Sequence, residues 1–504
     1  MTAPARKAAL GALAASGPGW QLNGDPGRLV TGIAYNSNRI SPGDLFVALR
    51  GGYFDGHDYA VQAIAAGAAA LLVERPMGLG VPEIIVPDAR SALASVAAAF
   101  FDQPSRKLMV IGITGTDGKT TTSYLLDWIL RQSGKRTGMI GTISVVIDQR
   151  AAADETRQTT PESLDVQRHL ADMVEAGVDV AIIEATSHGL DLHRLDAVRF
   201  KFAGVTNITL EHLEHHKTIA AYRRAKAKLF ERVDEINGAA VINLDDAGAI
   251  EMLPFTAGSS VVTYSLENDA TLRGRAVRLG VDGSAFELVH DGVVRQVRLP
   301  MLGGYNISNA LCAAGLALTL GIDLDCIVES LAHAPAIPGR MEQIDLGQPF
   351  TVVVDYAHTP DALMSVLTLL RSLNPDGRLI VVSGSGGERD VAKRPLQGAV
   401  CASLADYCIF TTEDPRQEDA AVIIAQIAAG AVARGAADDR VFVQITDRQE
   451  AIQRAIDRAR PGDVVLLAGK GHERSIIWGL EKRPWDEAAA ARAALTARGY
   501  GSQS

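Results

Sequence analysis

The chain has few cysteines, no long apolar run and no excess of positive charge. The four cysteines among its 504 residues (Cys312, Cys326, Cys401, Cys408) lack C-x-x-C spacing, which points away from disulfide frameworks and zinc knuckles and favours a reducing, cytoplasmic environment. The longest apolar stretches, such as 63–73, fall short of the roughly 18 to 20 residues that span a bilayer, so no membrane helix is expected. A net charge of −10 argues against a general nucleic-acid or acidic-membrane partner. Any anionic ligand must therefore be met by a local site.

What the sequence has in quantity is strand-length apolar runs that alternate with Ala- and Leu-rich helical stretches. The run at 108–114 precedes a helical stretch at 121–134, and the run at 351–357 precedes another at 361–373. This alternation predicts an α/β fold with parallel sheets covered by helices. At roughly 150 residues a domain, the length predicts three domains.

Two breaks divide the chain. An Ala-rich helical segment ends near 102–105, just before the strand that includes Leu108, and a second helical region ends near 336–340. We therefore expect domains at 1–106, 107–338 and 339–504. The middle domain also contains a β-rich stretch at 261–300, where Asp-Gly turns predict hairpins.

The strongest local signal is the glycine-rich segment 112–121, GITGTDGKTT, between an apolar strand and an amphipathic helix. Such a loop directs backbone N–H groups and the positive end of a helix dipole at a phosphate, while Lys119 adds a mobile charge and Thr120 a hydroxyl for Mg²⁺. The general pattern G-x-x-x-x-G-K-[ST] is not met strictly, because Ile113 stands at its first position and the spacing runs from Gly115. The segment predicts a nucleotide site and leaves kinase, GTPase, motor and ligase open.

Further polar residues follow the next apolar strand. Glu184 and His188 emerge at its carboxyl end, where open α/β sheets place ligand-binding groups. A carboxylate there can take a Mg²⁺ shared with the phosphates, and the alternative is a structural acidic residue in a loop.

A histidine cluster and two lysines come later in the middle domain. His212, His215 and His216 lack H-E-x-x-H spacing and a nearby cysteine, so hydrogen-bonded loop histidines are favoured over a zinc site. Lys226 and Lys228 lie on a helix that we expect to be exposed, where both side chains would be solvated.

Together these segments resemble one family, the Mur ligases that build the stem peptide of the peptidoglycan precursor. Within it, the segments 41–59, 186–194 and 469–473 are similar to the MurE type, which adds the third residue to UDP-N-acetylmuramoyl-L-alanyl-D-glutamate. The matching segments run in family order from about residue 30 to residue 475, and ten ordered motifs are far more specific than one phosphate loop. They are GITGTDGKTTT, EATSHGLDLHR, TNITLEHLEHH, AKAKLF, GGYNISNA, PGRMEQI, DYAHTPDAL, GGERDVAKRP, TTEDPRQED and AGKGHE.

The resemblance implies an N-terminal α/β domain for the UDP-sugar, a central P-loop ATPase-like parallel-sheet domain and a C-terminal Rossmann-like domain with the amino-acid pocket. It implies a ligase that forms ADP and phosphate. ATP phosphorylates the D-Glu side-chain carboxylate, and the amine of a diamino acid attacks the resulting acyl phosphate. This converts a poor leaving group into a good one, so that the protein contributes mainly positioning and charge neutralisation.

The resemblance also assigns the residues around ATP and two Mg²⁺ ions. Glu184 is the expected ligand of the Mg²⁺ between the phosphates, and His212 that of the Mg²⁺ at the acyl phosphate. Lys226 matches a lysine that CO₂ carbamylates, which turns a cation into an anion beside metal. The expected catalytic residues are Lys119, Glu184, His212 and Lys226, and the expected metal ligands are Thr120, Glu184, His212 and Lys226 as its carbamate. The expected ATP-binding residues are Gly115, Thr116, Asp117, Gly118, Lys119, Thr120, Thr121, Asn306, Asn309, Arg340 and Asp355, the last two closing over ATP on domain movement.

Two further sets are matched to the other substrates. The residues matched to UDP-muramoyl-peptide contacts are Tyr35, Ser37, Gly52, Tyr53, Phe54, Thr159, Thr160, Thr186 and Arg194. The residues matched to the amino-acid pocket are Arg389, Glu413, Asp414, Pro415, Arg416, Gly469 and Glu473. The expected partners are these small molecules, without nucleic acid or membrane, and the expected state is a monomer in the cytoplasm.

Three departures from the family pattern concern the nucleotide substrates. Asn36-Ser37-Asn38 stands where Asp-Ser-Arg is usual, which removes one basic contact near uridine. Asp117 stands where asparagine is common and adds a negative charge near the phosphates. Thr186 replaces a serine and keeps the hydroxyl.

The fourth departure concerns the added amino acid. Glu413-Asp414-Pro415-Arg416 stands where the meso-diaminopimelate signature is Asp-Asn-Pro-Arg. An aspartate at 414 accepts hydrogen bonds only, and its charge favours a bare ammonium, as in L-lysine or L-ornithine. Arg416 and Arg389 can grip a carboxylate, and Glu473 can pair with an ammonium. We therefore expect meso-diaminopimelate, with L-lysine and L-ornithine as alternatives.

Two other classes of function stay open. A P-loop kinase or simple NTPase explains Lys119 but leaves the segments 413–416 and 469–473 without a role. A catalytically dead binding module predicts the loss of a metal or phosphate ligand, yet Lys119, Glu184, His212 and Lys226 are all present.

Overall fold

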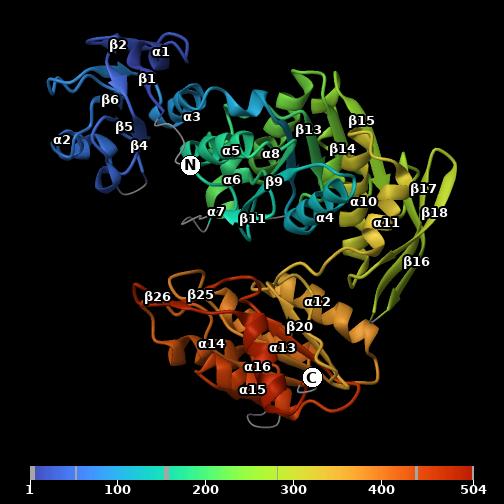
Figure 1. Cartoon of the computed structure of the whole chain (residues 1–504). Helices are drawn as coiled ribbons and strands as arrows, with labels where there is room; N and C mark the ends of the chain where they lie inside the picture. Colours follow the sequence, from blue (N-terminus) through green and yellow to red (C-terminus); the bar gives the residue numbers. More distant parts are fainter. Residues whose placement is uncertain are drawn as a thin grey trace. The chain divides into compact units, whose positions relative to one another are not determined.

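A computed structural model of the chain describes residues 6–51, 54–152, 158–209, 211–280, 282–436 and 441–501 (Figure 1). Helices and strands alternate along it, and three of its sheets contain parallel strand pairs, which confirms the predicted α/β class. None of the helices within the described ranges combines the length and the apolar content that a membrane crossing needs.

The chain divides into two compact units. One comprises Met1–Arg275, Glu287–Val297 and Ile307–Leu331, and the other Ala276–Phe286, Arg298–Asn306 and Ala332–Ser504. The first unit carries the N-terminal sheet and most of the middle sheet, and the second carries the C-terminal sheet. The domain boundaries expected after residues 106 and 338 stay a prediction.

The N-terminal sheet has the strand order β2-β7-β6-β5-β4, with parallel pairs from β7 to β4. Successive residues of β5 point to opposite faces: Leu45 and Val47 pack with α1 and α3, and Phe46 packs with α2. Asp88 caps α3 by accepting from the N–H groups of Arg90 and Ser91. The elements are β1 (Ala8–Ala9), α1 (Leu10–Ala14), β2 (Gln21–Asn23), β3 (Leu29–Val30), β4 (Gly32–Ala34), η1 (Ser37–Arg39), β5 (Asp44–Val47), η2 (Gly56–Tyr59), α2 (Ala60–Ala65), β6 (Ala70–Val73), β7 (Glu83–Ile85) and α3 (Ala89–Phe100).

The middle sheet centres on β8, which is parallel to β12 on one side and to β13 on the other. Its elements up to β14 are η3 (Pro104–Arg106), β8 (Met109–Thr114), α4 (Lys119–Gln132), β9 (Thr137–Ile140), β10 (Val145–Ile147), β11 (Arg150–Ala152), α5 (Ser163–Glu175), β12 (Val180–Glu184), α6 (Ser187–Asp191), β13 (Phe202–Val205), α7 (Leu213–His216), α8 (Ile219–Asp234) and β14 (Ala239–Asn243). Because parallel strands end at one edge, the residues after β8 and β12 are neighbours.

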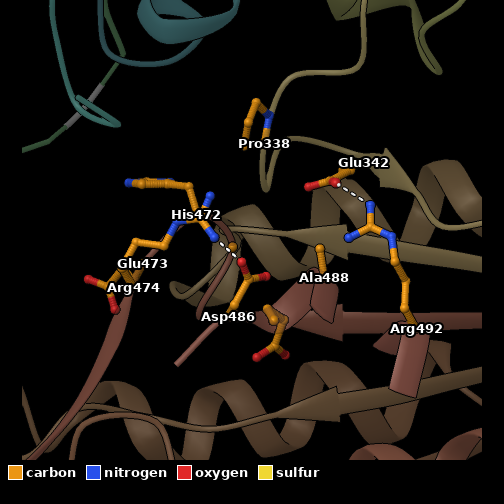
Figure 2. A pocket seen from close by; sticks show the side chains of 10 residues that line it. Pro338, Glu342, His472, Glu473, Arg474, Asp486, Ala488 and Arg492 are labelled. Atoms are coloured by element: carbon orange, nitrogen blue, oxygen red, sulfur yellow. Dashed lines mark hydrogen bonds and ion pairs between the residues drawn. The ribbon is translucent and has the colours of Figure 1, made fainter. Parts of the chain in front are cut away.

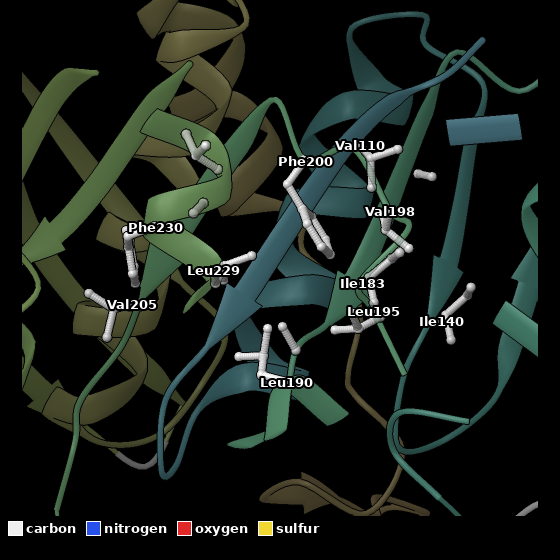
Figure 3. Close-up of a cluster of buried hydrophobic side chains, with 14 of the residues drawn as sticks. Val110, Ile140, Ile183, Leu190, Leu195, Val198, Phe200, Val205, Leu229 and Phe230 are labelled. Atoms are coloured by element: carbon white, nitrogen blue, oxygen red, sulfur yellow. The ribbon is translucent and has the colours of Figure 1, made fainter. Parts of the chain in front are cut away.

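Both faces of the middle sheet are covered by helices, as a buried parallel sheet requires. On one face, Val110 and Ile183 pack with Phe200 and with Leu229 and Phe230 of α8 (Figure 3). On the other face, a Cβ on Gly204 would meet side chains of α10 (Gly304–Thr319), and α4 contacts β8, β9 and β12. The phosphate loop therefore follows a strand whose sheet is covered by helices on both faces.

The β-rich stretch forms the predicted hairpins at the end of the same sheet. The strands β16, β17 and β18 lie side by side in that order, and Asp291 and Gly292 turn between the last two with φ of +47° and +77°. Two positive φ angles are the requirement of a type I′ turn, which explains the Asp-Gly pair. The remaining elements up to α11 are α9 (Ala247–Ile250), η4 (Leu253–Thr256), β15 (Ser260–Ser265), β16 (Leu272–Gly280), β17 (Gly283–His290), β18 (Val293–Leu299) and α11 (Leu324–Ala332).

The C-terminal sheet has the strand order β19-β20-β24-β21-β22-β23 and is parallel except for β19. Helices α12, α13 and α14 pack on one face, and α15 and α16 on the other. The elements are β19 (Glu342–Gln343), β20 (Thr351–Asp355), α12 (Pro360–Leu373), β21 (Leu379–Ser383), α13 (Lys393–Leu404), β22 (Tyr407–Phe410), α14 (Ala420–Val432), β23 (Phe442–Gln444), α15 (Arg448–Arg458), β24 (Val464–Ala468), β25 (Ser475–Trp478), β26 (Glu481–Pro484) and α16 (Glu487–Ala497). The expected amino-acid residues follow β21, β22 and β24 and so meet at one edge.

Candidate active site

The segment between β8 and α4 turns on two glycines with positive φ. Gly115 has φ +153°, and Gly118, just before the first residue of α4, has φ +82°. A Cβ on Gly115 would lie 1.9 Å from Thr206 Oγ1, and one on Gly118 would lie 2.2 Å from Asn309 Oδ1. The loop therefore needs glycine at both positions, and it brings Asn309 beside Gly118.

The helix that follows this loop begins without a side-chain cap. Lys119 Nζ donates to the carbonyl oxygens of Gly115 at 2.9 Å and Thr116 at 2.7 Å, so the ammonium folds back over the loop. Asp117 is exposed, and Thr121 in the first turn is buried. An uncapped helix N-terminus with a cation above it suits a phosphate group.

Glu184 ends β12 fully buried beside the start of α4. Its Oε2 accepts from Thr120 Oγ1 at 3.0 Å and from Thr142 Oγ1 at 2.8 Å, and its Oε1 accepts from Thr142 N at 3.0 Å. A Cβ on Gly141 would lie 2.3 Å from Oε1, so only glycine leaves room for the carboxylate. Thr120 and Glu184 are thus brought together, whereas Thr142 was missed, although it follows β9 at the same sheet edge.

A row of threonine hydroxyls leads from Glu184 to residues matched to the muramoyl peptide. Thr142 Oγ1 lies 3.0 Å from Thr159 Oγ1, and Thr160 Oγ1 lies 2.9 Å from Thr186 Oγ1. Thr160 Oγ1 also donates to the Glu184 carbonyl at 2.7 Å. The segments 159–160 and 184–186 are therefore joined in one hydrogen-bonded group.

Arg194 joins this hydrogen-bonded group through the backbone carbonyl of Thr160. Its guanidinium donates to the Thr160 carbonyl at 3.0 Å and to Glu162 at 3.1 Å, and Arg90 pairs with the same Glu162 at 3.1 Å. Glu162 was missed in the sequence, because nothing in its local spacing indicates two arginine partners.

The interpretation of Lys226 as a solvated lysine is wrong. Its side chain is 1% exposed, and Nζ donates to the Gly115 carbonyl at 2.7 Å and lies 4.6 Å from the centre of the Tyr222 ring. Burial and the neighbouring Lys119 hold the pKa of this amine well below its usual range. Lys228 is half-buried and pairs with Asp191 at 3.0 Å. The two lysines of one motif thus have different environments.

Three other histidines gather around His188. Its ring lies 4.6 Å from that of His212, 4.4 Å from that of His215 and 5.5 Å from that of His216. Burial and the neighbouring imidazoles lower the pKa of His188 to about 4, so it is neutral near pH 7. His212 lies 3.5 Å from Glu211 and 3.3 Å from Glu214, and its ring centre is 6.4 Å from that of Tyr222. Tyr222 is therefore a shared neighbour of His212 and Lys226.

The residues matched to the uridine side are more dispersed. Tyr35 donates to Asp165 Oδ2 at 3.0 Å, and burial with this carboxylate raises the pKa of its hydroxyl. Ser37 contacts Gln62 at 3.4 Å, and Phe54 is 69% exposed. Gly52 and Tyr53 lie outside the described residues.

In the C-terminal unit, the side chains of Asp355 and Arg340 lie near one another. Asp355 accepts from the N–H groups of Met341 and Ala357 at 2.8 Å, and burial raises the pKa of its carboxyl. The Arg340 guanidinium lies 5.0 Å from the Tyr356 ring centre. Asn306, which belongs to the same unit, donates to the Leu302 carbonyl at 2.9 Å.

The expected amino-acid residues form a compact charged group. Asp414 Oδ1 accepts from the buried Lys470 Nζ and from Ile477 N, both at 2.9 Å, and Lys470 also pairs with Glu473. Asp414 therefore carries an internal counter-ion, which the sequence did not reveal because Lys470 is 56 positions away. Glu473 shares this lysine.

Two other atoms of the same group lack a hydrogen-bond partner among the described residues. Glu413 Oε2 and Arg416 Nε are buried without a hydrogen-bond partner in the described part of the chain. Arg416 has φ +53°, and a Cβ on Gly469 would lie 2.9 Å from Glu413 Oε2. Arg389 is exposed, and Pro415 O would touch a Cβ on Gly387 at 2.0 Å. A carboxylate and a guanidinium with unmet hydrogen bonds suit a ligand with both charges.

A cavity of about 220 Å³ adjoins the segment 471–474 (Figure 2). Arg474 pairs with Asp486 and Arg492 with Glu342 across its lining, as the dashed lines in Figure 2 show. Of the expected amino-acid residues only Glu473 lines it, so this cavity is distinct from the charged group at 413–416.

Known family models match most of the chain. The Mur ligase family catalytic domain matches residues 29–101, the Mur ligase middle domain 113–317, and the Mur ligase glutamate ligase domain 339–471. Together they cover most of each segment that carried the resemblance.

Relatives match over nearly their full length. The chain is 46% identical over 489 residues to a UDP-N-acetylmuramyl-tripeptide synthetase of Roseiflexus sp. (strain RS-1), covering 94% of this chain and 96% of the relative. It is 40% identical over 487 residues to the UDP-N-acetylmuramoyl-L-alanyl-D-glutamate--2,6-diaminopimelate ligase of Geobacillus kaustophilus (strain HTA426), covering 96% and 98%. A solved structure of a ligase of that second name is 31% identical, with a TM-score of 0.68 and coverage of 95% and 97%. The chain belongs to the Mur ligase family.

Proposed function

We propose that this chain is an ATP-dependent ligase that joins meso-2,6-diaminopimelate to the D-Glu carboxylate of UDP-N-acetylmuramoyl-L-alanyl-D-glutamate, with ADP and phosphate as products, in peptidoglycan precursor synthesis. The observation that carries the proposal is the contact of Thr120 with Glu184 at the phosphate loop, in a chain 40% identical to a ligase named for this reaction. The enzyme is proposed to act as a cytoplasmic monomer on small molecules, without nucleic acid or membrane. The domain boundaries after residues 106 and 338 and the ATP-side roles of Asn306, Asn309, Arg340 and Asp355 belong to the proposal.

The residues present fit magnesium. Thr120 and Glu184 offer hard oxygen donors in a buried place next to the phosphate loop, the donor type that Mg²⁺ prefers. We assign one ion to these two residues and a second to His212 and the Lys226 carbamate. Bound there, Mg²⁺ supplies positive charge that offsets the phosphate oxygens.

The burial of Lys226 supports its carbamylation. Only a neutral amine can attack CO₂, and the lowered pKa of Lys226 increases the fraction of its amine that is neutral. The amine has Lys119 as a neighbouring cation. The carbamate would place an anion beside the Lys119 ammonium, and the attraction between the two charges favours it.

The other residues position the reactants. The uncapped N–H groups of α4 and the Lys119 ammonium hold the ATP phosphates, while Arg194 and the threonine row orient the carboxylate to be phosphorylated. The acyl phosphate then reacts with the incoming amine, and phosphate leaves. The buried setting of Glu184 and Lys226 limits the access of water at this end of the site.

The charged group at 413–416 supports meso-diaminopimelate over L-lysine and L-ornithine. The argument for a bare ammonium rested on an added anion at Asp414, and that anion is already paired with Lys470 inside the protein. Glu413 is left to meet an ammonium, and Arg416 and Arg389 are left to meet a carboxylate. The distal end of diaminopimelate carries both groups, whereas lysine and ornithine lack the carboxylate.

The test measures phosphate and tripeptide from purified full-length protein with ATP, Mg²⁺, the UDP-muramoyl dipeptide and one diamino acid. We expect product with meso-diaminopimelate, and preference for it when all three diamino acids compete. Phosphate release that needs no amine would favour the simple NTPase, and no release with any diamino acid would reject the ligase. Lys119→Ala should abolish release, and the matched control Lys135→Ala, an exposed lysine beyond the end of the same helix, should not.

A further inference from the structure

A second group of potential metal ligands lies beside the proposed magnesium centre. One ligand atom each of Asp191, His215 and His216 lies within 4.8 Å of the others. Asp191 ends α6, and the two histidines end α7, so the group joins two short helices. Asp191 and His215 are 24 positions apart in the chain. None of these three residues has a role in the proposed reaction.

Two of the ligands are already oriented toward one another. Asp191 Oδ2 lies 3.0 Å from His215 Nε2, while Asp191 Oδ1 accepts from Lys228 Nζ at 3.0 Å. Lys228 thus fixes the carboxylate and leaves one oxygen for the group, as outer partners of metal-binding carboxylates do. A cation that enters takes the place of the proton between Oδ2 and Nε2.

The third ligand, His216, has a ring nitrogen that lacks a hydrogen-bond partner among the described residues. His216 is 7% exposed, and its Nε2 is buried without a hydrogen-bond partner in the described ranges. A buried polar atom without a partner is destabilising, and a bound ion is one of the explanations for such an atom. A metal bond to this nitrogen would remove the cost.

The donor set selects the kind of metal. Two imidazole nitrogens with one carboxylate oxygen suit Zn²⁺, Ni²⁺ or Co²⁺, whereas Mg²⁺ and Ca²⁺ prefer oxygen alone. Zinc bonds of about 2.0 to 2.1 Å place the ligand atoms of a tetrahedral site roughly 3.3 Å apart. The 3.0 Å from Asp191 Oδ2 to His215 Nε2 is close to that spacing, and the His216 ligand atom, within 4.8 Å of both, has to move closer. Water can fill the fourth position.

We propose that Asp191, His215 and His216 form a site for a transition-metal dication of the zinc type, separate from the magnesium centre. Metal there ties α6, which follows the substrate-side Thr186, to the segment that carries His212. The site stands on its own geometry and does not depend on the proposed ligase reaction.

The test titrates ZnCl₂ into full-length protein freed of metal, in excess Mg²⁺, by calorimetry. We expect one tight site, weakened by at least about 100-fold in Asp191→Asn and in His215→Asn, since even outer-shell changes cost 10- to 100-fold. The control His193→Asn, which alters a nearby histidine paired with Asp196, should bind like the unchanged protein. Co²⁺ in place of zinc should give a visible tetrahedral absorption band that His215→Asn loses.

Three outcomes would overturn the proposal. They are no zinc binding by the unchanged protein, equal binding by both ligand variants, and binding that survives His215→Asn but is lost in His212→Asn. The last would place the ion on His188, His212 and Glu214. Because the His215 side chain is 29% exposed, His215→Asn keeps the test open if Asp191→Asn does not fold.

Discussion

Replacing Lys226 with methionine separates the chemistry of its amine from its packing. Methionine fills a similar volume on α8 but has no amine to carbamylate. We expect Lys226→Met to lower phosphate release with all substrates present by at least about 100-fold, the cost of removing one electrostatic group from a reaction centre. Lys226→Ala should behave likewise and recover part of its turnover when short carboxylic acids are added, because they can replace the carbamate.

Lys226→Met should leave the fold at least nearly as stable as that of the unchanged protein. The lost hydrogen bond to the Gly115 carbonyl is worth about 1 kcal/mol, and that oxygen keeps its bond from Lys119 at 2.9 Å. The methionine also removes an amine that is costly to bury. We therefore expect Lys226→Met to lower the free energy of unfolding by no more than about 1 kcal/mol.

The pH dependence of stability gives a further check on Lys226. The folded pKa of the amine lies well below its usual 10.5, so unfolding takes up a proton between those two values. The stability of the unchanged protein therefore rises with pH across that window and falls as pH drops through it. Lys226→Met, measured in buffer free of CO₂, should lack this contribution.

Urea denaturation and phosphate release measure the two effects separately. The control is Arg224→Met, which alters an exposed side chain of α8 that pairs with Glu231 at 2.7 Å. The reasoning fails if Lys226→Met keeps near-normal turnover. It also fails if Lys226→Met loses more than about 3 kcal/mol of stability, since that would indicate a charged, paired amine in the folded protein.

Three further substitutions test other parts of the site. Gly118 has φ +82°, and a Cβ there would lie 2.2 Å from Asn309 Oδ1. Gly118→Ala should therefore lose at least about 1 to 2 kcal/mol of stability in urea denaturation and bind ATP more weakly in an ATP titration. Unchanged values in both measurements would contradict the loop geometry. Burial and nearby cations lower the pKa of His472 from 6.5 to about 3. The free energy of unfolding should therefore fall as pH drops through that range, by up to about 1.4 kcal/mol per pH unit. In acid denaturation, His472→Gln should show a shallower dependence of stability on pH. Asp414→Asn frees positive charge on Lys470 and should raise the KM for L-lysine relative to meso-diaminopimelate by about tenfold, whereas a shift toward L-lysine would contradict the assigned charges.

The fold and the phosphate-loop end of the site were largely accessible from the sequence. Alternating apolar and helical stretches predicted the α/β class, and the shared edge of parallel strands predicted that Glu184 would lie near the loop. The same edge rule would have found Thr142, which follows β9.

The position of Lys226 within the sequence of α8 indicates that its side chain is buried. The buried residues of α8 include Tyr222, Leu229 and Phe230, and Lys226 lies four residues from the first and the last of them, on the apolar stripe. A lysine at a core-facing position is a candidate buried amine, whereas Lys228 lies off the stripe.

Long-range pairings were out of reach of sequence reasoning. The contact of Asp414 with Lys470 joins positions 56 apart, and it reverses the charge argument that the local motif suggested. Asp191 and His215 are likewise 24 positions apart, and neither has ligand spacing within its own segment.

The acyl phosphate is tested most directly by following oxygen. The UDP-muramoyl dipeptide is prepared with ¹⁸O in the D-Glu side-chain carboxylate and incubated with the enzyme, ATP, Mg²⁺ and meso-diaminopimelate. If the carboxylate attacks the terminal phosphorus of ATP and the amine then displaces phosphate, one ¹⁸O per turnover appears in the released phosphate. Phosphate that takes its new oxygen from water instead would contradict the account.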